Sequence, residues 1–143
     1  MAARCAEQLN AHKLEIETAH GVSAHVFSLD LTAEVGAADL HAQIKAAGLS
    51  VDILINNAGF GRQGEFVECS LEADLGMMDL NVKALVAGDM IEQGSGKILY
   101  VDSTSGFMLG PLQATYFATK SFVNSFSQAQ DEELRGRVMP ESW

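Results

Sequence analysis

Three side chains in this sequence have the types and spacing of a proton-transfer site. Tyr116 and Lys120 stand four residues apart in the run YFATK, and Ser103 follows an apolar run upstream. A helix places residues four apart on one face. A free tyrosine has a pKa near ~10, and a nearby cation favours the phenolate. The phenol could therefore act as a general acid or base while the Ser103 hydroxyl orients a carbonyl or alcohol. Taken alone, this spacing often arises by chance, and the alternative is an aromatic helix residue beside a solvated lysine.

The elements that must position these side chains alternate between helix and strand. We expect helices over residues 3–19, from Thr32 to Gly48, from Ser70 onward and over 114–135, and strands over 22–29, 51–55 and 97–101. This alternation is typical of βαβ units with a parallel sheet. The β-branched content of the strand at 51–55 suits a sheet that is buried on both faces.

Several of the helix ends are marked by single residues. Gly21 and Gly48 are typical stop signals, and Thr32 and Ser70 are typical N-terminal caps. Glu72 and Asp74 follow Ser70, where negative charge interacts favourably with the helix dipole.

Composition and charge exclude several classes of protein. The chain has 143 residues, which is enough for one domain over residues 1–143. Its net charge of −10 argues against a nucleic-acid partner. No apolar run is long enough to span a bilayer, and the first residues lack the apolar stretch of a signal peptide. Cys5 and Cys69 have no metal or redox spacing, and the four histidines are scattered. We therefore expect a cytoplasmic protein with no metal site and no membrane or nucleic-acid partner.

Four motifs, in order along the chain, resemble those of the short-chain dehydrogenase/reductase family of NAD(P)-dependent oxidoreductases. They are the sequence NNAG at 56–59, Asn81, Ser103, and the Tyr116–Lys120 pair. Each is weak alone, but together with the intervening strands they are specific. The resemblance covers nearly the whole chain and implies a Rossmann-like, doubly wound parallel sheet and an enzyme. The implied reaction transfers a hydride between a nicotinamide and a small carbonyl or alcohol substrate.

The resemblance also implies a role for each residue. Tyr116 would be the general acid/base, Lys120 would favour its phenolate and hold the nicotinamide ribose, and Ser103 would bind the substrate oxygen. Asn81 would hold a water molecule that links Lys120 to solvent. The other cofactor-binding positions are Asn57, Ala58 and Gly59, together with Tyr116 and Lys120.

Three further positions would contact the adenosine half of the cofactor. By resemblance, Asp30 and Leu31 flank the adenine, and Arg4 falls where some family members bind the 2′-phosphate of NADP. Arg4 therefore favours NADP, with NAD possible. The alternatives are a turn residue at Asp30 and a solvated helix end at Arg4.

Residues 59–64 form a literal G-x-G-x-x-G motif after a strand. A phosphate-binding loop requires these glycines to open directly into a helix. Here residues 65–69 intervene before the Ser70 cap, so we interpret the segment as the loop that follows the NNAG motif.

The sequence also departs from the family pattern. The first two strands, the glycine-rich phosphate loop and the last strand have no counterpart, so we expect a partial fold, truncated at both ends. In the doubly wound order 3-2-1-4-5-6, the strand at 22–29 would then lie roughly 14 Å from the others, at about 4.8 Å per strand. The sheet must rearrange, a partner must fill the gap, or the segment packs poorly. We expect marginal stability, or association through sheet edges and apolar helix faces.

Two alternatives to an active enzyme remain open. One is a non-catalytic remnant that acts as an interaction or oligomerisation module, since family members usually form dimers or tetramers. The other is a flavodoxin-like binder, which would not need Ser103, Tyr116 and Lys120 together.

The segment between Asn81 and Ser103 is about six residues shorter than in the family, equivalent to ~9 Å of helix. This difference affects where Asn81 lies relative to Lys120. The sequence does not define the substrate.

Overall fold

The structure is a computed structural model that describes residues 1–83 and 96–134. These residues belong to two compact units, Met1–Leu49 and Ser50–Trp143, and each is described here by itself. The single domain expected over residues 1–143 remains a prediction.

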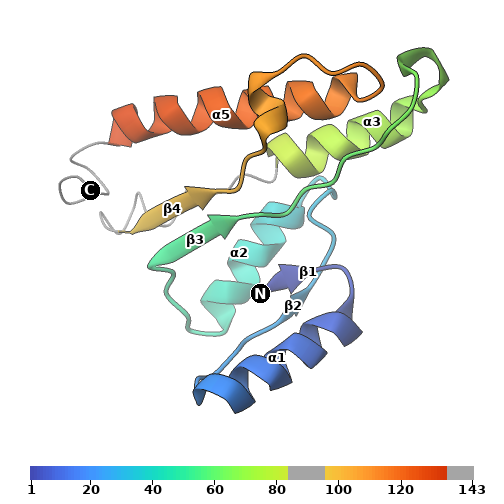
Figure 1. Cartoon of the computed structure of the whole chain (residues 1–143). Coiled ribbons are helices and arrows are strands. Elements are labelled where there is room, and N and C mark those ends of the chain that lie inside the picture. The colour runs from blue at the N-terminus through green and yellow to red at the C-terminus, as the bar shows by residue number, and fades with distance from the viewer. Residues whose placement is uncertain (84–95, 135–143) are drawn as a thin grey trace. The chain divides into compact units, whose positions relative to one another are not determined.

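The first unit contains two short parallel strands and two helices. Its elements are β1 (Ala2–Ala3), α1 (Ala6–His20), β2 (Phe27–Ser28) and α2 (Gly36–Ala46) (Figure 1). β1 pairs in parallel with β2, with Ala2 opposite Phe27 and Ala3 opposite Ser28. β1 was not expected from the sequence, and it gives the strand at 27–28 a partner. The described strands form two hydrogen-bonded pairs, and the expected gap between this strand and the strands of the second unit stays a prediction.

Three predicted boundaries in this unit need correction. The strand predicted over residues 22–29 is only β2, Phe27–Ser28, because only these two residues pair with β1. α1 begins at Ala6 rather than Ala3, because residues 2–3 form β1. Thr32 does not cap α2, since its backbone N–H and its hydroxyl both donate to Asp30 Oδ1, at 2.9 and 2.8 Å. The chain turns there, and α2 starts only after Val35. The stop at Gly21 is confirmed, because its φ of 65° is left-handed. Glycine adopts this conformation without strain.

The second unit contains the other pair of parallel strands and the longest helix of the described residues. Its elements are β3 (Ile53–Asn56), a 3₁₀ turn (Phe66–Glu68), α3 (Leu71–Met78), a π-helical segment (Asp79–Lys83), β4 (Lys97–Tyr100), a second 3₁₀ turn (Thr104–Phe107) and α5 (Ala114–Leu134). β3 and β4 pair from Ile53–Lys97 to Asn56–Tyr100. Figure 1 shows these strands side by side, with α3 packed against α5. The alternation of helices and parallel strands confirms the partial Rossmann-like α/β class.

Only one face of the β3–β4 sheet is well covered. Alternate residues are half-buried in both strands, and Tyr100 on this face meets Phe126 of α5 edge to face, with ring centroids 6.0 Å apart. On the opposite face, Ile53 and Ile55 are 62% and 58% exposed. The expectation that this strand is buried on both faces is therefore wrong. Residues 53–55 are all apolar, so they lack the alternation of polar and apolar residues that would reveal a half-exposed strand.

The start of α3 follows the prediction. The Ser70 hydroxyl accepts a hydrogen bond from the Ala73 N–H at 3.2 Å, and Glu72 and Asp74 lie in the first turn. Both features are favourable at a helix N-terminus. We predicted that the segment between Asn81 and Ser103 is short. Most of this segment lies outside the described residues.

Candidate active site

Asn81 lies on the π-helical segment after α3 and is almost fully buried, with 3% of its surface exposed. Its Oδ1 accepts from the Phe60 N–H at 3.1 Å, and its Nδ2 donates to the Phe60 carbonyl at 3.1 Å. Nδ2 also donates to Thr119 Oγ1 at 3.0 Å. These two bonds use both amide N–H donors. Asn81 therefore ties the loop after β3 to α5, and the water link from Asn81 to Lys120 remains a prediction.

Thr119 carries this connection to the residue expected to do the chemistry. Its hydroxyl donates to the Tyr116 carbonyl at 2.8 Å. This is a back-bond to the preceding helical turn. Thr119 is 3% exposed. Its hydroxyl therefore accepts from one partner and donates to another, in a residue that is almost fully shielded from solvent.

The ring of Tyr116 packs against the loop that follows β3. A methyl group placed on Gly61 would lie 3.0–3.2 Å from Cδ2, Cγ and Cε2 of the ring. A glycine at this position thus permits close approach of the ring to the backbone. In the part of the chain that the structure describes, the Tyr116 hydroxyl makes no hydrogen bond.

Lys120 and Ser103 lie at the carboxyl end of β4. Lys120 Nζ donates to the Val101 carbonyl at 2.8 Å. Ser103 precedes the second 3₁₀ turn, where its hydroxyl accepts from the Ser105 N–H at 3.2 Å. The structure thus brings Ser103 and Lys120 to the same strand end, and α5 carries Tyr116 one turn from Lys120. No hydrogen bond joins these three side chains among the described residues.

The NNAG motif follows β3, the neighbouring parallel strand. Asn57, Ala58 and Gly59 are exposed there. A methyl group on Gly59 would lie 3.0 Å from Asn81 Oδ1, so the motif passes closely over that amide. As expected, the glycines of residues 59–64 lead into a loop and a 3₁₀ turn, and the next α-helix starts only after Ser70.

The candidate adenosine residues belong to the first unit. Arg4 follows β1, and Asp30 and Leu31 follow β2. All three therefore lie at the carboxyl ends of two parallel strands, where α/β sheets bind ligands. Hydrogen bonds from the Thr32 N–H and hydroxyl, with a smaller contribution from the charge of Arg4, lower the pKa of Asp30 below its usual value of 3.8. Asp30 is thus a turn residue, as the alternative interpretation held. The adenosine role of all three residues remains a prediction.

Two of the hollows among the described residues lie along α5. An apolar groove of about 430 Å³ is lined by Met108, Leu109, Gly110, Pro111, Ala114, Phe117, Ala118 and Ser121. The Phe117 ring meets the Tyr116 ring edge to face, with centroids 6.4 Å apart, so this groove adjoins the candidate site.

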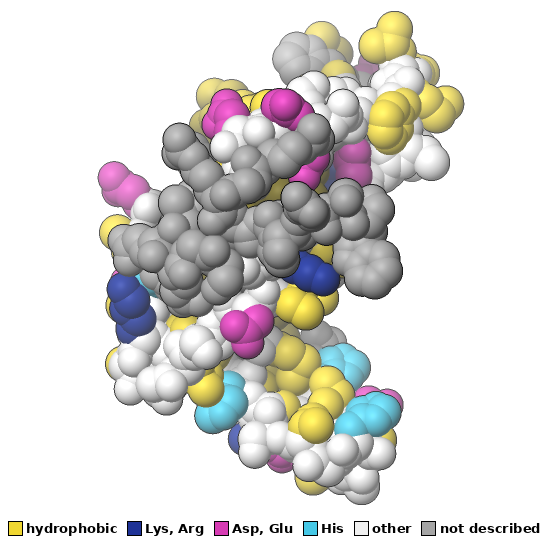
Figure 2. All heavy atoms as spheres, turned by 90° about the vertical axis from the view of Figure 1, so that its left-hand side faces the viewer, with side chains coloured by type: hydrophobic (Ala, Val, Ile, Leu, Met, Phe, Trp, Pro, Cys, Tyr) yellow, Lys and Arg dark blue, Asp and Glu magenta, His cyan; other side chains and the backbone are white. Residues whose placement is uncertain are grey.

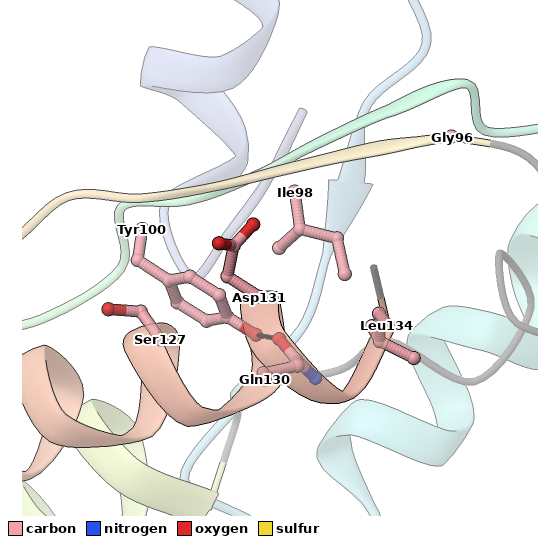
Figure 3. Close-up of a pocket in the computed structure, with 7 residues that line it drawn as sticks. All are labelled: Gly96, Ile98, Tyr100, Ser127, Gln130, Asp131 and Leu134. Atoms are coloured by element: carbon pink, nitrogen blue, oxygen red, sulfur yellow. Dashed lines mark hydrogen bonds between the residues drawn. The ribbon is translucent and has the colours of Figure 1, made fainter. Parts of the chain in front are cut away.

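The second hollow, of about 190 Å³, lies between β4 and the end of α5 and contains none of the predicted site residues (Figure 3). Its lining includes Tyr100, whose hydroxyl donates to Gln130 Oε1. Burial raises the pKa of Tyr100 above 10.0. Within the described ranges, no group of His, Cys, Asp or Glu side chains is suited to hold a metal ion.

Sequence reasoning missed Thr119 and Gly61. The signal for Thr119 was a threonine inside a helix, where its hydroxyl often bonds to the carbonyl three or four residues earlier. The partner Asn81, 38 residues away, could not be foreseen from local sequence. Gly61 gave no signal beyond its place in the glycine-rich run.

Comparisons with known proteins agree with this geometry. The family model described as short chain dehydrogenase matches residues 1–139. The very-long-chain 3-oxoacyl-CoA reductase of Macaca fascicularis is 34% identical to this chain over 148 residues. The match covers 94% of this chain and 46% of that relative. The Homo sapiens protein of the same name is 33% identical, with the same coverage. This chain therefore spans about half the length of these curated relatives.

Solved structures give the same result. The bulky-bulky ketone specific alcohol dehydrogenase from Comamonas testosteroni aligns with a TM-score of 0.86 and 29% identity, over 96% of this chain and 58% of that one. A short-chain dehydrogenase from Sphingobium yanoikuyae, solved in complex with NADPH, aligns with a TM-score of 0.84 and 30% identity, over 96% and 56%. This chain belongs to the short-chain dehydrogenase family, as the motifs indicated.

Among residues 1–83 and 96–134, no helix has the length and apolar character needed to cross a membrane.

Proposed function

We propose that this chain takes part in NAD(P)-dependent hydride transfer between a nicotinamide cofactor and a carbonyl or alcohol substrate, with Tyr116 as the general acid/base. One observation carries the proposal. Lys120 of α5 reaches the carboxyl end of β4, where Ser103 lies, and Tyr116, one turn earlier on α5, packs its ring on the loop after β3. Because the Tyr116 hydroxyl bonds to none of the described residues, its proton is available to a substrate oxygen.

The residues present fit a nicotinamide cofactor. The Lys120 ammonium has three donors and uses one on Val101, which leaves two for ribose hydroxyls. Asn57, Ala58 and Gly59 are exposed beside the same strand ends. In the first unit, the role of the Arg4 guanidinium toward the phosphate of NADP stays a prediction. When bound, NADPH supplies the hydride.

The chain's own side chains handle the proton. In the reducing direction, Tyr116 would donate its hydroxyl proton to the substrate oxygen as the carbonyl carbon accepts the hydride. Ser103 would orient that oxygen through its hydroxyl, and the Lys120 charge would favour the resulting phenolate. In the oxidising direction, the same phenolate would accept the proton of an alcohol.

The groove beside Phe117 supports a substrate with a bulky apolar group next to its carbonyl. Its lining is largely apolar, and Leu109 and Met108 are open to solvent. The names of the relatives, a very-long-chain 3-oxoacyl-CoA reductase and a bulky-bulky ketone specific dehydrogenase, fit the same substrate class.

The test is a titration of the full chain with NADPH and NADH, followed by turnover with aliphatic and aromatic ketones. We expect saturable binding, tighter for NADPH, and ketone-dependent oxidation of the cofactor. The absence of saturable binding at millimolar cofactor would refute the proposal for this chain.

A second candidate function is an interaction module without catalysis, which would pair with a copy of itself. Leu71, Leu75 and Met78 follow a helical repeat along α3 and are 73%, 48% and 46% exposed. Such an apolar stripe is unusual for a helix facing water. Tyr116→Phe separates the two functions, since it should abolish turnover under the first and leave self-association unchanged under the second.

We propose a cytoplasmic location in either case, based on the free thiols of Cys5 and Cys69.

A further inference from the structure

We propose that Thr119 and Gly61 are positioning residues that close a ring of contacts around Tyr116. This inference rests on the proposed function, because it concerns the proposed acid/base. The ring runs from the Tyr116 carbonyl to Thr119, to Asn81, to the Phe60 backbone, to Gly61, and back to the Tyr116 aromatic ring.

The first half of the ring holds the backbone of Tyr116. Thr119 donates to the Tyr116 carbonyl at 2.8 Å and accepts from Asn81 at 3.0 Å. Because Thr119 and Asn81 are each only 3% exposed, water does not replace either bond easily. Removing the hydroxyl would leave one buried Asn81 donor unpaired, which is unfavourable.

The second half holds the side chain of Tyr116. Asn81 bonds to both the N–H and the carbonyl of Phe60, which fixes the backbone at the residue before Gly61. Gly61 then lies against the ring so closely that a methyl group there would displace the ring by a few tenths of an ångström. The same amide therefore sets both the helix turn that carries Tyr116 and the surface on which its ring rests.

This arrangement has a chemical consequence. A proton donor must be held close to the position at which the substrate oxygen binds, and small displacements reduce the rate strongly. Neither Thr119 nor Gly61 has the chemistry to act on a substrate itself. Both act through the position of Tyr116.

The test measures the Tyr116 ring directly in the full chain. The protein has two tyrosines, so ring-¹³C-labelled tyrosine gives two sets of NMR signals, and Tyr116→Phe assigns them. Thr119→Val removes the hydroxyl at nearly constant volume, Thr119→Ser keeps it, and Gly61→Ala adds only a methyl against the ring. Thr18→Val, at an exposed position of α1, is the matched control.

We expect Thr119→Val and Gly61→Ala to shift or broaden the Tyr116 signals while those of Tyr100 stay in place. Thr119→Ser and Thr18→Val should leave both sets unchanged. In turnover assays, the first two variants should lose roughly 10- to 100-fold in kcat with little change in the KM for NADPH, and Thr119→Ser should restore kcat.

Unchanged Tyr116 signals in folded Thr119→Val, or in Gly61→Ala, would overturn the proposal. If Thr119→Val does not fold, Gly61→Ala decides the outcome alone. If the wild-type chain shows no turnover, the proposed function fails, while the NMR comparison still decides whether the ring of contacts holds Tyr116.

Discussion

At the residue scale, the side chains of the candidate site are held mainly by main-chain groups. Lys120 is bound to a strand-end carbonyl, and Asn81 to both backbone groups of Phe60. Asp30, in the first unit, accepts two hydrogen bonds from Thr32. Such bonds fix where each functional group points before any ligand arrives, which reduces the cost of ordering it on binding.

The Thr32 contacts predict a pH effect. They lower the pKa of Asp30, so the folded unit gains stability above the ordinary carboxyl pKa of 3.8 and loses it as the pH falls through the lowered value. Thr32→Val removes the hydroxyl bond and should raise the Asp30 pKa part of the way back. A ¹³C carboxyl titration by NMR measures this change, with Thr18→Val as control. An unchanged titration midpoint in Thr32→Val would contradict the assignment.

The residue types at the site were predictable, but not all of their contacts. Tyr116, Lys120, Ser103 and Asn81 are visible in the sequence because their order and spacing are specific to the family. Thr119 was not, because its role depends on a partner 38 residues away. The water link predicted for Asn81 remains a prediction, and the bonds of its side-chain amide to a loop and a helix were not foreseen.

At the element scale, the helix ends followed local chemistry where a single residue decided them. Gly21 and Ser70 end and begin helices as predicted. The prediction that Thr32 caps a helix failed because Asp30, two residues earlier, accepts the hydrogen bonds of Thr32. β1 could not be foreseen, since a two-residue strand has no periodicity and exists only through its pairing with β2.

A pair of glycine substitutions tests how α5 is packed. A methyl group on Gly110 would overlap the ring of Phe117 on α5, whereas one on Gly76, within α3, would meet no atom within 4 Å. Gly110→Ala should therefore destabilise the protein by about 1–3 kcal/mol through overpacking. Gly76→Ala should stabilise it by roughly 0.5–1 kcal/mol, because alanine favours a helix interior.

Urea unfolding of both variants beside the wild type measures these changes. Equal midpoints for Gly110→Ala and the wild type would show that the loop before α5 does not pack on Phe117 as described.

At the scale of the whole molecule, the described residues bury few apolar side chains fully. Only Leu9, Met77 and Val123 among them are buried hydrophobic residues, and many large apolar side chains remain open to solvent. Hydrophobic side chains are visible on the molecular face drawn in Figure 2. A small core gives limited hydrophobic stabilisation, which supports the prediction of marginal stability or association.

Self-association through the α3 stripe is testable in solution. Light scattering during gel filtration should show a dimer or larger species for the wild type. Leu75→Glu should weaken the association constant by at least roughly tenfold, because a charge would replace a buried apolar contact. Leu14→Glu, at an exposed position of α1, is the matched control. A monodisperse wild-type monomer with a sharp, cooperative melt would contradict the expectation.

The most direct test of the central claim follows a label from cofactor to product. The full chain is incubated with NADPH deuterated at the transferable C4 position and an aryl alkyl ketone, and deuterium in the product alcohol is measured by mass spectrometry. Wild type should give deuterated alcohol, and Tyr116→Phe should reduce its rate of formation by roughly 10²–10⁴-fold. An equal rate in Tyr116→Phe would contradict the role of Tyr116, and alcohol without deuterium would contradict hydride transfer itself.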